Sequence, residues 1–170
     1  MTTHTEKSRV HVRSIFPDRT IVGLETVPDK TGGCLDQESA DRPARVVIRA
    51  AGESKKEFFL TVFHAGSGTS AMPSVEALSP PAADMKGVLI KDATQNRGLL
   101  VSESGQPVTS AISFAIHPGT GMEFLVADLP PGRTYAVTVK RGPGEQTVTL
   151  EPSTSGWVTA DAQGVLRLTL

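Results

Sequence analysis

One serine of this chain stands close to a histidine, in the segment HAGSG from His64 to Gly68. A serine hydroxyl and an imidazole are two members of a catalytic triad, and Asp84 or Asp92 could supply the third. The segment departs from the Gly-x-Ser-x-Gly order, and no helical pattern follows it to build a nucleophile elbow. It also lacks the lysine of a phosphate-binding loop. We therefore expect a glycine-rich loop after a strand, with a small hydrolase using His64 and Ser67 as an alternative.

The remaining histidines and carboxylates lack the spacing of a metal site or a glycoside hydrolase. Four scattered histidines form no His-x-His or His-x-x-x-His pair, so the sequence predicts no metal site and no cofactor: His4, His11, His64 and His117. Five acidic residues lie at the ends of predicted strands, and we expect them to be solvated turn carboxylates instead of a catalytic pair: Asp84, Asp92, Glu103, Glu123 and Asp128. We expect Trp157, the only tryptophan, to anchor the core.

Composition bounds the class of protein. A chain of 170 residues buries about 70% of its unfolded surface, which is enough for one domain. The net charge of −1 makes nucleic acid an unfavourable partner, and no run approaches the ~20 apolar residues of a membrane span. Cys34 is the only cysteine, so no internal disulfide forms. The polar start MTTHTEKSR resembles no signal peptide, which leaves a cytoplasmic protein or a piece of a longer chain.

Short apolar–polar alternations separated by Gly and Pro predict an all-β fold without helices. We expect residues 1–7 to be a disordered lead and residues 8–170 to be one two-layer antiparallel β-sandwich of about 10–12 short strands. The predicted strands cover residues 10–15, 20–26, 45–51, 57–64, 75–78, 86–91, 98–102, 111–116, 122–127, 134–140, 146–151, 156–159 and 165–170.

Two further expectations concern the order of strands. The segment Glu57–His64 has apolar residues on both faces, which predicts a central strand covered from two sides. We expect it to form an antiparallel hairpin with Arg45–Ala51 at the heart of the core. The polar stretches at 27–43 and 65–74 are expected to be loops.

The block KKEFFLTVFHAGSGTSAMPSVEALSPPAADMKGVLIKD, from Lys55 to Asp92, resembles the C-terminal β-sandwich of heparinase II/III-like polysaccharide lyases. The shared features are a charged turn before a Phe-Leu-x-Val strand, a polar loop with a proline, and a Gly-Val-x-Ile strand. The ending LPPGRTYAV, from Leu129 to Val137, is similar to the last strands of that family and also to fibronectin-like modules.

The resemblance implies a non-catalytic accessory β-sandwich domain that supports the catalytic domain or the sugar cleft of a lyase. No catalytic residue carries over, because the family's Tyr and His act in a helical toroid and central sheet absent from this chain. The implied partners are the catalytic domain of a larger parent chain or an anionic polysaccharide, and the parent would be secreted or periplasmic. Loops 27–43 and 65–74 would border the sugar cleft or the domain interface.

The alternative function is a free-standing carbohydrate- or protein-binding module. An anionic polysaccharide would need cations, and the candidates are Lys55, Lys56, Arg97, Arg133 and Arg141.

Overall fold

The computed structural model describes residues 8–26, 44–52, 56–67, 69–81, 83–93, 95–117 and 121–170. Within these ranges the chain forms thirteen strands and no helix, so the all-β prediction is confirmed. The strands are β1 (Ser8–Phe16), β2 (Thr20–Thr26), β3 (Ala44–Ala50), β4 (Leu60–Ser67), β5 (Ser74–Leu78), β6 (Met85–Lys91), β7 (Asn96–Ser102), β8 (Ile112–Ile116), β9 (Met122–Val126), β10 (Thr134–Gly142), β11 (Glu145–Pro152), β12 (Val158–Thr159) and β13 (Leu166–Thr169).

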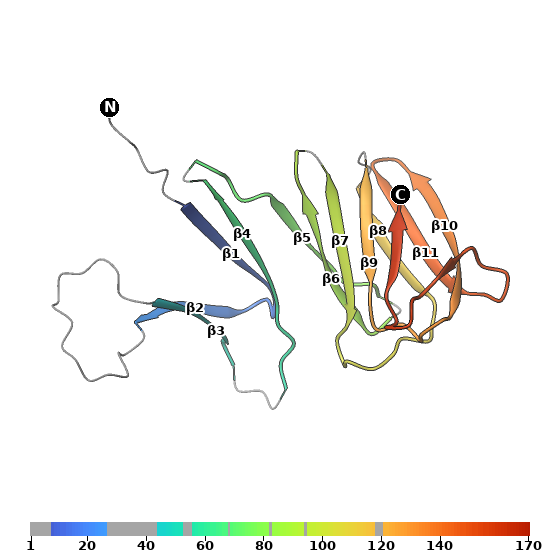
Figure 1. Cartoon of the computed structure of the whole chain (residues 1–170), viewed down its shortest axis with the longest axis horizontal. Helices are drawn as coiled ribbons and strands as arrows, with labels where there is room; N and C mark the ends of the chain where they lie inside the picture. Colours follow the sequence, from blue (N-terminus) through green and yellow to red (C-terminus); the bar gives the residue numbers. More distant parts are fainter. Residues whose placement is uncertain are drawn as a thin grey trace. The chain divides into compact units, whose positions relative to one another are not determined.

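The chain divides into two compact units. The smaller unit, Val12–Val62, contains the two-stranded sheet of β2 and β3. The larger unit contains every strand from β5 to β13 (Figure 1). A second two-stranded sheet joins β1 and β4.

The larger unit is a β-sandwich, which is the fold class that the sequence predicts for residues 8–170. One layer is a five-stranded sheet in the order β13-β9-β7-β6-β5, and the other is a four-stranded sheet in the order β12-β10-β11-β8. Within each of these two sheets, all neighbouring strands pair antiparallel except β7 and β9, which pair in parallel. The chain leaves β7 for the opposite layer, forms β8, and returns to place β9 beside β7.

One apolar core lies between the two layers. Leu100 and Phe124 of the five-stranded sheet and Phe114 and Val148 of the four-stranded sheet belong to a single cluster, and each is at least 97% buried. The rings of Phe114 and Phe124 come from opposite layers and lie 5.1 Å apart between centroids. Burial of side chains of this size contributes about 1.5–3 kcal/mol each to the free energy of unfolding.

A glycine lets Phe124 lie flat against the neighbouring strand. Gly98 on β7 is the register partner of Phe124 on β9, and a Cβ at residue 98 would overlap the ring atoms of Phe124. The ring therefore occupies the space that a side chain would fill. This contact explains why a residue with low strand propensity lies at the centre of the sheet.

The predicted hairpin between Arg45–Ala51 and Glu57–His64 is wrong. Residues of β3 pair with β2 in seven antiparallel positions, from Thr20 opposite Ala50 to Thr26 opposite Ala44, and β4 pairs with β1. The predicted central position of Glu57–His64 is also wrong, because Phe63 of this segment is 62% exposed. Apolar residues on both faces indicated two covering layers, but β4 belongs to a sheet of only two strands.

The prediction that Trp157 anchors the core is also wrong, since its side chain is 70% exposed. Val158 is the register partner of the buried Tyr135, and successive side chains of a strand point to opposite faces. Trp157 therefore points outward. Gly156 before it lies against the backbone of Tyr135, where a Cβ would overlap the carbonyl.

Tyr135, the only tyrosine, is fully buried, and its hydroxyl has no hydrogen-bond partner within the described ranges. Burial raises the pKa of the phenol above its usual 10.0, while the charge of Arg133 acts in the opposite direction. The folded chain therefore keeps the phenol protonated at a pH at which the unfolded chain ionises it. The preference of the folded state for the protonated phenol contributes to the free energy of unfolding at lower pH. This contribution is lost as the pH rises from 10.0 through the raised pKa.

We predict that Tyr135→Phe raises the free energy of unfolding by about 1 kcal/mol at neutral pH, because it removes a buried hydroxyl without a partner. The advantage of the variant should grow above a pH of about 10, since phenylalanine cannot ionise. Urea unfolding at neutral and alkaline pH measures both effects. The phenolate absorbance of the single tyrosine is the internal control, and titration of the folded phenol at its usual pKa would contradict the prediction.

Candidate functional site

The sandwich is closed along one side and open along the other. The edge strands β12 and β13 contact each other. The opposite edge strands are β5 in the five-stranded sheet and β8 in the four-stranded sheet. A groove of about 310 Å³ lies between β5 and β8, and this β5–β8 groove is a candidate binding site.

The β5–β8 groove is lined by uncharged residues. Leu78 and the exposed Pro81 come from β5 and the turn after it, and Phe114 and the exposed Ala115 come from β8. Leu78 and Phe114 are core residues whose edges reach the opening, so the floor of the groove is continuous with the core. An apolar concave surface of this kind binds side chains or small apolar ligands.

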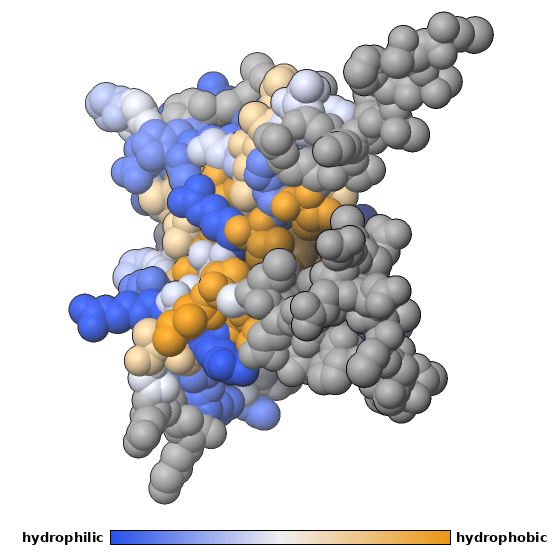
Figure 2. Space-filling view, turned by 90° about the vertical axis from the view of Figure 1, so that its left-hand side faces the viewer, coloured by the Kyte–Doolittle hydropathy of each residue, from blue (hydrophilic) through white to orange (hydrophobic). Residues whose placement is uncertain are grey.

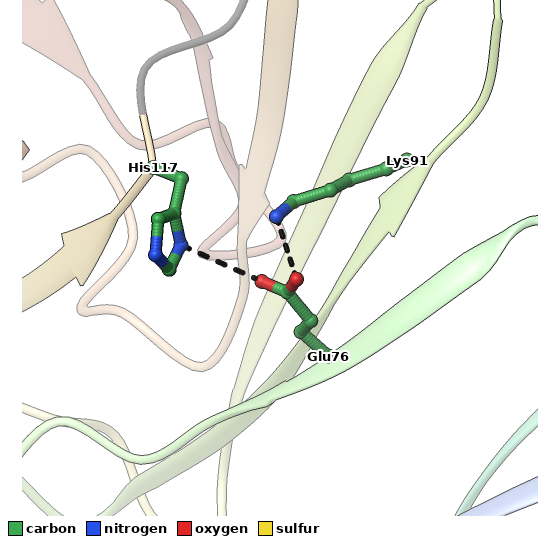
Figure 3. A network of polar contacts seen from close by, with 3 residues as sticks. All are labelled: Glu76, Lys91 and His117. Carbon is green, nitrogen blue, oxygen red and sulfur yellow. Dashed lines mark hydrogen bonds and ion pairs between the residues drawn. The ribbon is translucent and has the colours of Figure 1, made fainter. Parts of the chain in front are cut away.

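A polar cluster lies beside the same two strands (Figure 3). Lys91 Nζ, at the end of β6, donates a hydrogen bond of 2.6 Å to Glu76 Oε1 on β5. His117 follows β8, and its Nδ1 lies 3.9 Å from Glu76 Oε2. Glu76 therefore has contacts with both layers of the sandwich.

The strand register explains why Glu76 and Lys91 meet. Leu89 of the core is the register partner of Glu76, and Lys91 is two residues beyond Leu89 on the same face of β6. Both charged residues thus occupy the inward face at the rim of the sandwich, where they remain partly exposed. A partly exposed ion pair of this kind contributes about 0–1 kcal/mol to stability. Its larger effect is to give the rim a polar end beside the uncharged groove.

Sequence reasoning missed Glu76 as a residue of interest. The signal was present in the segment Ser74–Leu78, because Glu76 shares the inward face with Leu78. A carboxylate at an inward position needs a cation nearby, and Lys91 supplies it.

Arg133 and Arg141, two of the basic residues predicted to bind a polysaccharide, do not lie together. Lys55 lies outside the described residues, and Lys56 is exposed before β4. Arg97 lies on β7, where its Nη2 donates a 3.1 Å hydrogen bond to Gln95 Oε1. Arg133 precedes β10 and Arg141 lies near its other end, so strand geometry separates them by about 26 Å. The binding role of these residues stays a prediction.

Ser67 bonds to neighbouring hydroxyls. Its Oγ lies 3.2 Å from Thr69 Oγ1 and 3.1 Å from Ser70 Oγ. His64 lies beside His11, with 6.0 Å between the ring centroids, and His11 Nε2 donates to the Ser70 carbonyl over 2.9 Å. The predicted loop at 65–74 begins later than expected, because β4 continues to Ser67. The stretch 27–43 lies outside the described residues.

Several of the carboxylates expected at strand ends have structural partners. Asp128 adopts a positive φ of 56°, and its Oδ2 accepts a hydrogen bond of 2.9 Å from the Ser102 amide. Glu123 accepts from Gln95, and Glu103 lies 3.8 Å from Lys86. These contacts fix the ends of strands rather than bring two carboxylates together.

Within the described ranges, no three His, Cys, Asp or Glu side chains are close enough to hold a metal ion. The same part of the chain has no helix that is long and apolar enough to cross a membrane.

Comparison with models of protein families, with curated proteins and with solved structures finds no match to this chain.

Proposed function

We propose that this chain is an accessory binding module that docks onto another protein domain, and that the β2–β3 hairpin makes the contact. The observation that carries the proposal is a row of apolar side chains on one face of this hairpin. Val22 is the register partner of Ile48, and Val46 lies two residues from Ile48 on the same face. Val22 is 53% exposed and Val46 is 43% exposed.

The other face of the hairpin is not wholly polar either. Ile21 neighbours Val22, so its side chain points to the opposite face, where it is 60% exposed. Figure 2 shows apolar side chains in orange at the surface of the molecule, between hydrophilic residues in blue. A two-stranded sheet is marginally stable by itself, and grouped apolar side chains in water mark interaction surfaces. A docked partner would cover them.

The resemblance to heparinase II/III-like lyases suggests which partner this is. In such a protein the hairpin would pack against the catalytic part of the parent chain, and the sandwich would support it. The partner to test is therefore the polypeptide whose coding sequence directly adjoins the coding sequence of this chain.

We predict that Val22→Ser and Val46→Ser each weaken binding to that polypeptide about fivefold to tenfold, because each removes about 1 kcal/mol of apolar burial. Titration calorimetry on the purified pair measures the change. Val139→Ser is the matched control, since Val139 is a 39% exposed valine on β10 in the larger unit. Amide hydrogen exchange should slow in β2 and β3 on binding. Unchanged affinity of both hairpin variants, or absence of binding, would contradict the proposal.

A second candidate function is binding of an anionic polysaccharide, and the exposure of Trp157 favours it. Sugar rings stack on exposed aromatic faces, and an anionic sugar needs a cation nearby. The register of β10 and β12 places Arg133, the residue before Thr134, about three positions from Trp157 along the ladder, or about 10 Å. Alternation directs Arg133 to the face of Tyr135, so a polysaccharide that contacts both Arg133 and Trp157 would pass around the edge strand β12. Arg141 lies at the far end of β10.

We predict that heparin or a polyuronate changes the fluorescence of the single tryptophan, and that Trp157→Ala and Arg133→Ala each lower the affinity about tenfold. The affinity should also fall with added salt, and less steeply for Arg133→Ala. Arg13→Ala is the control, because Arg13 is an exposed arginine of β1 outside the predicted binding residues, and this variant should bind as the original chain does. An unchanged fluorescence, or an equal effect of Arg13→Ala, would count against this function.

A further inference from the structure

We propose that the β5–β8 groove takes up an extended peptide segment of another protein, which pairs with β8 as an added strand of the four-stranded sheet. Its alternate apolar side chains would enter the groove. This site lies in the larger unit and does not depend on docking through the β2–β3 hairpin.

The first support is the free edge of β8. This strand pairs with β11 along one side, from Ile112 opposite Leu150 to Ile116 opposite Gln146. Within the described ranges, no other backbone group bonds to residues 112–116. In an antiparallel pair, alternate residues direct their N–H and C=O groups away from the partner. The free edge of β8 therefore presents donors and acceptors in the spacing that another strand matches.

The second support is that β8 lacks the protection found at the other edges of the sandwich. The edge strand β5 runs into Pro80 and Pro81, and prolines cannot extend a ladder. The edge strand β12 has only two residues, and β13 carries the exposed Arg167. The sequence of β8 is ISFAI, without proline or charge, and its outward side chains are small. Proteins usually blunt an edge strand unless it is used for pairing.

The third support is the position and chemistry of the groove. A strand added to β8 lies about 4.8 Å from it, and every second side chain points to the same face as the inward residues of β8. Leu78 and Phe114 line the groove from that face, and Ser113 and Ala115 line it from the outward face of β8, so the groove reaches around the free edge of the strand. No lining residue is charged, so a charged side chain would lose its hydration there without a partner. The groove therefore selects apolar side chains at alternate positions of the peptide.

The polar cluster limits the length of the peptide. His117, which contacts Glu76, directly follows Ile116 at the end of β8. A strand that pairs with all of β8 matches its five residues before it meets these charged and polar groups. We expect a recognised segment of about this length.

A second copy of this chain fits the groove less well than a separate peptide. Two copies could pair antiparallel through their β8 strands, because the order of large and small side chains in ISFAI is nearly the same in both chain directions. The inward side chains of β8, however, are already buried in the core of their own copy. A second copy would offer hydrogen bonds but no side chain for the groove, whereas a peptide offers both.

The test uses the full chain and an acetylated heptapeptide in which threonine and valine alternate. We expect saturable binding at submillimolar peptide, measured by titration calorimetry, with slower amide exchange confined to residues 112–116. A permuted heptapeptide of the same composition, with its valines adjacent, should bind at least about tenfold more weakly, because its side chains cannot alternate between groove and solvent.

Two variants place a charge at exposed residues that line the groove, Ser79→Lys and Ala115→Lys. Each should lower the affinity for the alternating heptapeptide about tenfold or more. Thr138→Lys is the matched control, at an exposed position of β10 in the same sheet, and should bind normally. Urea unfolding of all three variants shows that each remains folded.

Several outcomes would overturn the proposal. These are failure of the alternating heptapeptide to bind at millimolar concentration, equal binding of the permuted peptide, and exchange protection outside β8. A concentration-dependent dimer that Ala115→Lys dissociates would instead assign the edge to a second copy.

Discussion

The contact between the inward faces of the two sheets is the interaction on which the larger unit depends. Phe114 and Phe124 meet across the layers with 5.1 Å between ring centroids, and the surrounding core residues are almost completely removed from water. This contact commits alternate residues of every sandwich strand to the interior. What remains for binding is therefore the exposed parts of the outer faces, the turns and the open edge between β5 and β8. The β5–β8 groove exists because one edge stays open while the core still reaches it.

Much of the secondary structure could be predicted from sequence, because alternation reports which face a side chain takes. The predicted strand at 20–26 matches β2, and those at 86–91 and 122–127 differ from β6 and β9 by single residues at their ends. Alternation does not report the neighbour of a strand. The pairing of β3 with β2, instead of β4, and the parallel pair of β7 and β9 depend on which edges meet in space.

The candidate sites were harder to predict for a related reason. Glu76, Lys91 and His117 come from three segments, and only the register of β5 with β6 and the approach of β8 bring them together. For Trp157, the residue type indicated a buried side chain. The register of its neighbour Val158 instead directs the Trp157 side chain outward, where it is exposed. Residue chemistry could be listed from sequence, but its arrangement required the fold.

The parallel placement of β7 beside β9 has a consequence for a chain that emerges gradually from the ribosome. Because β8 belongs to the other layer, β7 has β6 on one side and nothing on its other side until β9 has been made. During that interval a nascent chain presents Leu99, Leu100 and Val101 on a strand that any neighbouring nascent chain could pair with. Translation that slows between residues 102 and 122 would lengthen this exposure, and holdase chaperones would then matter most.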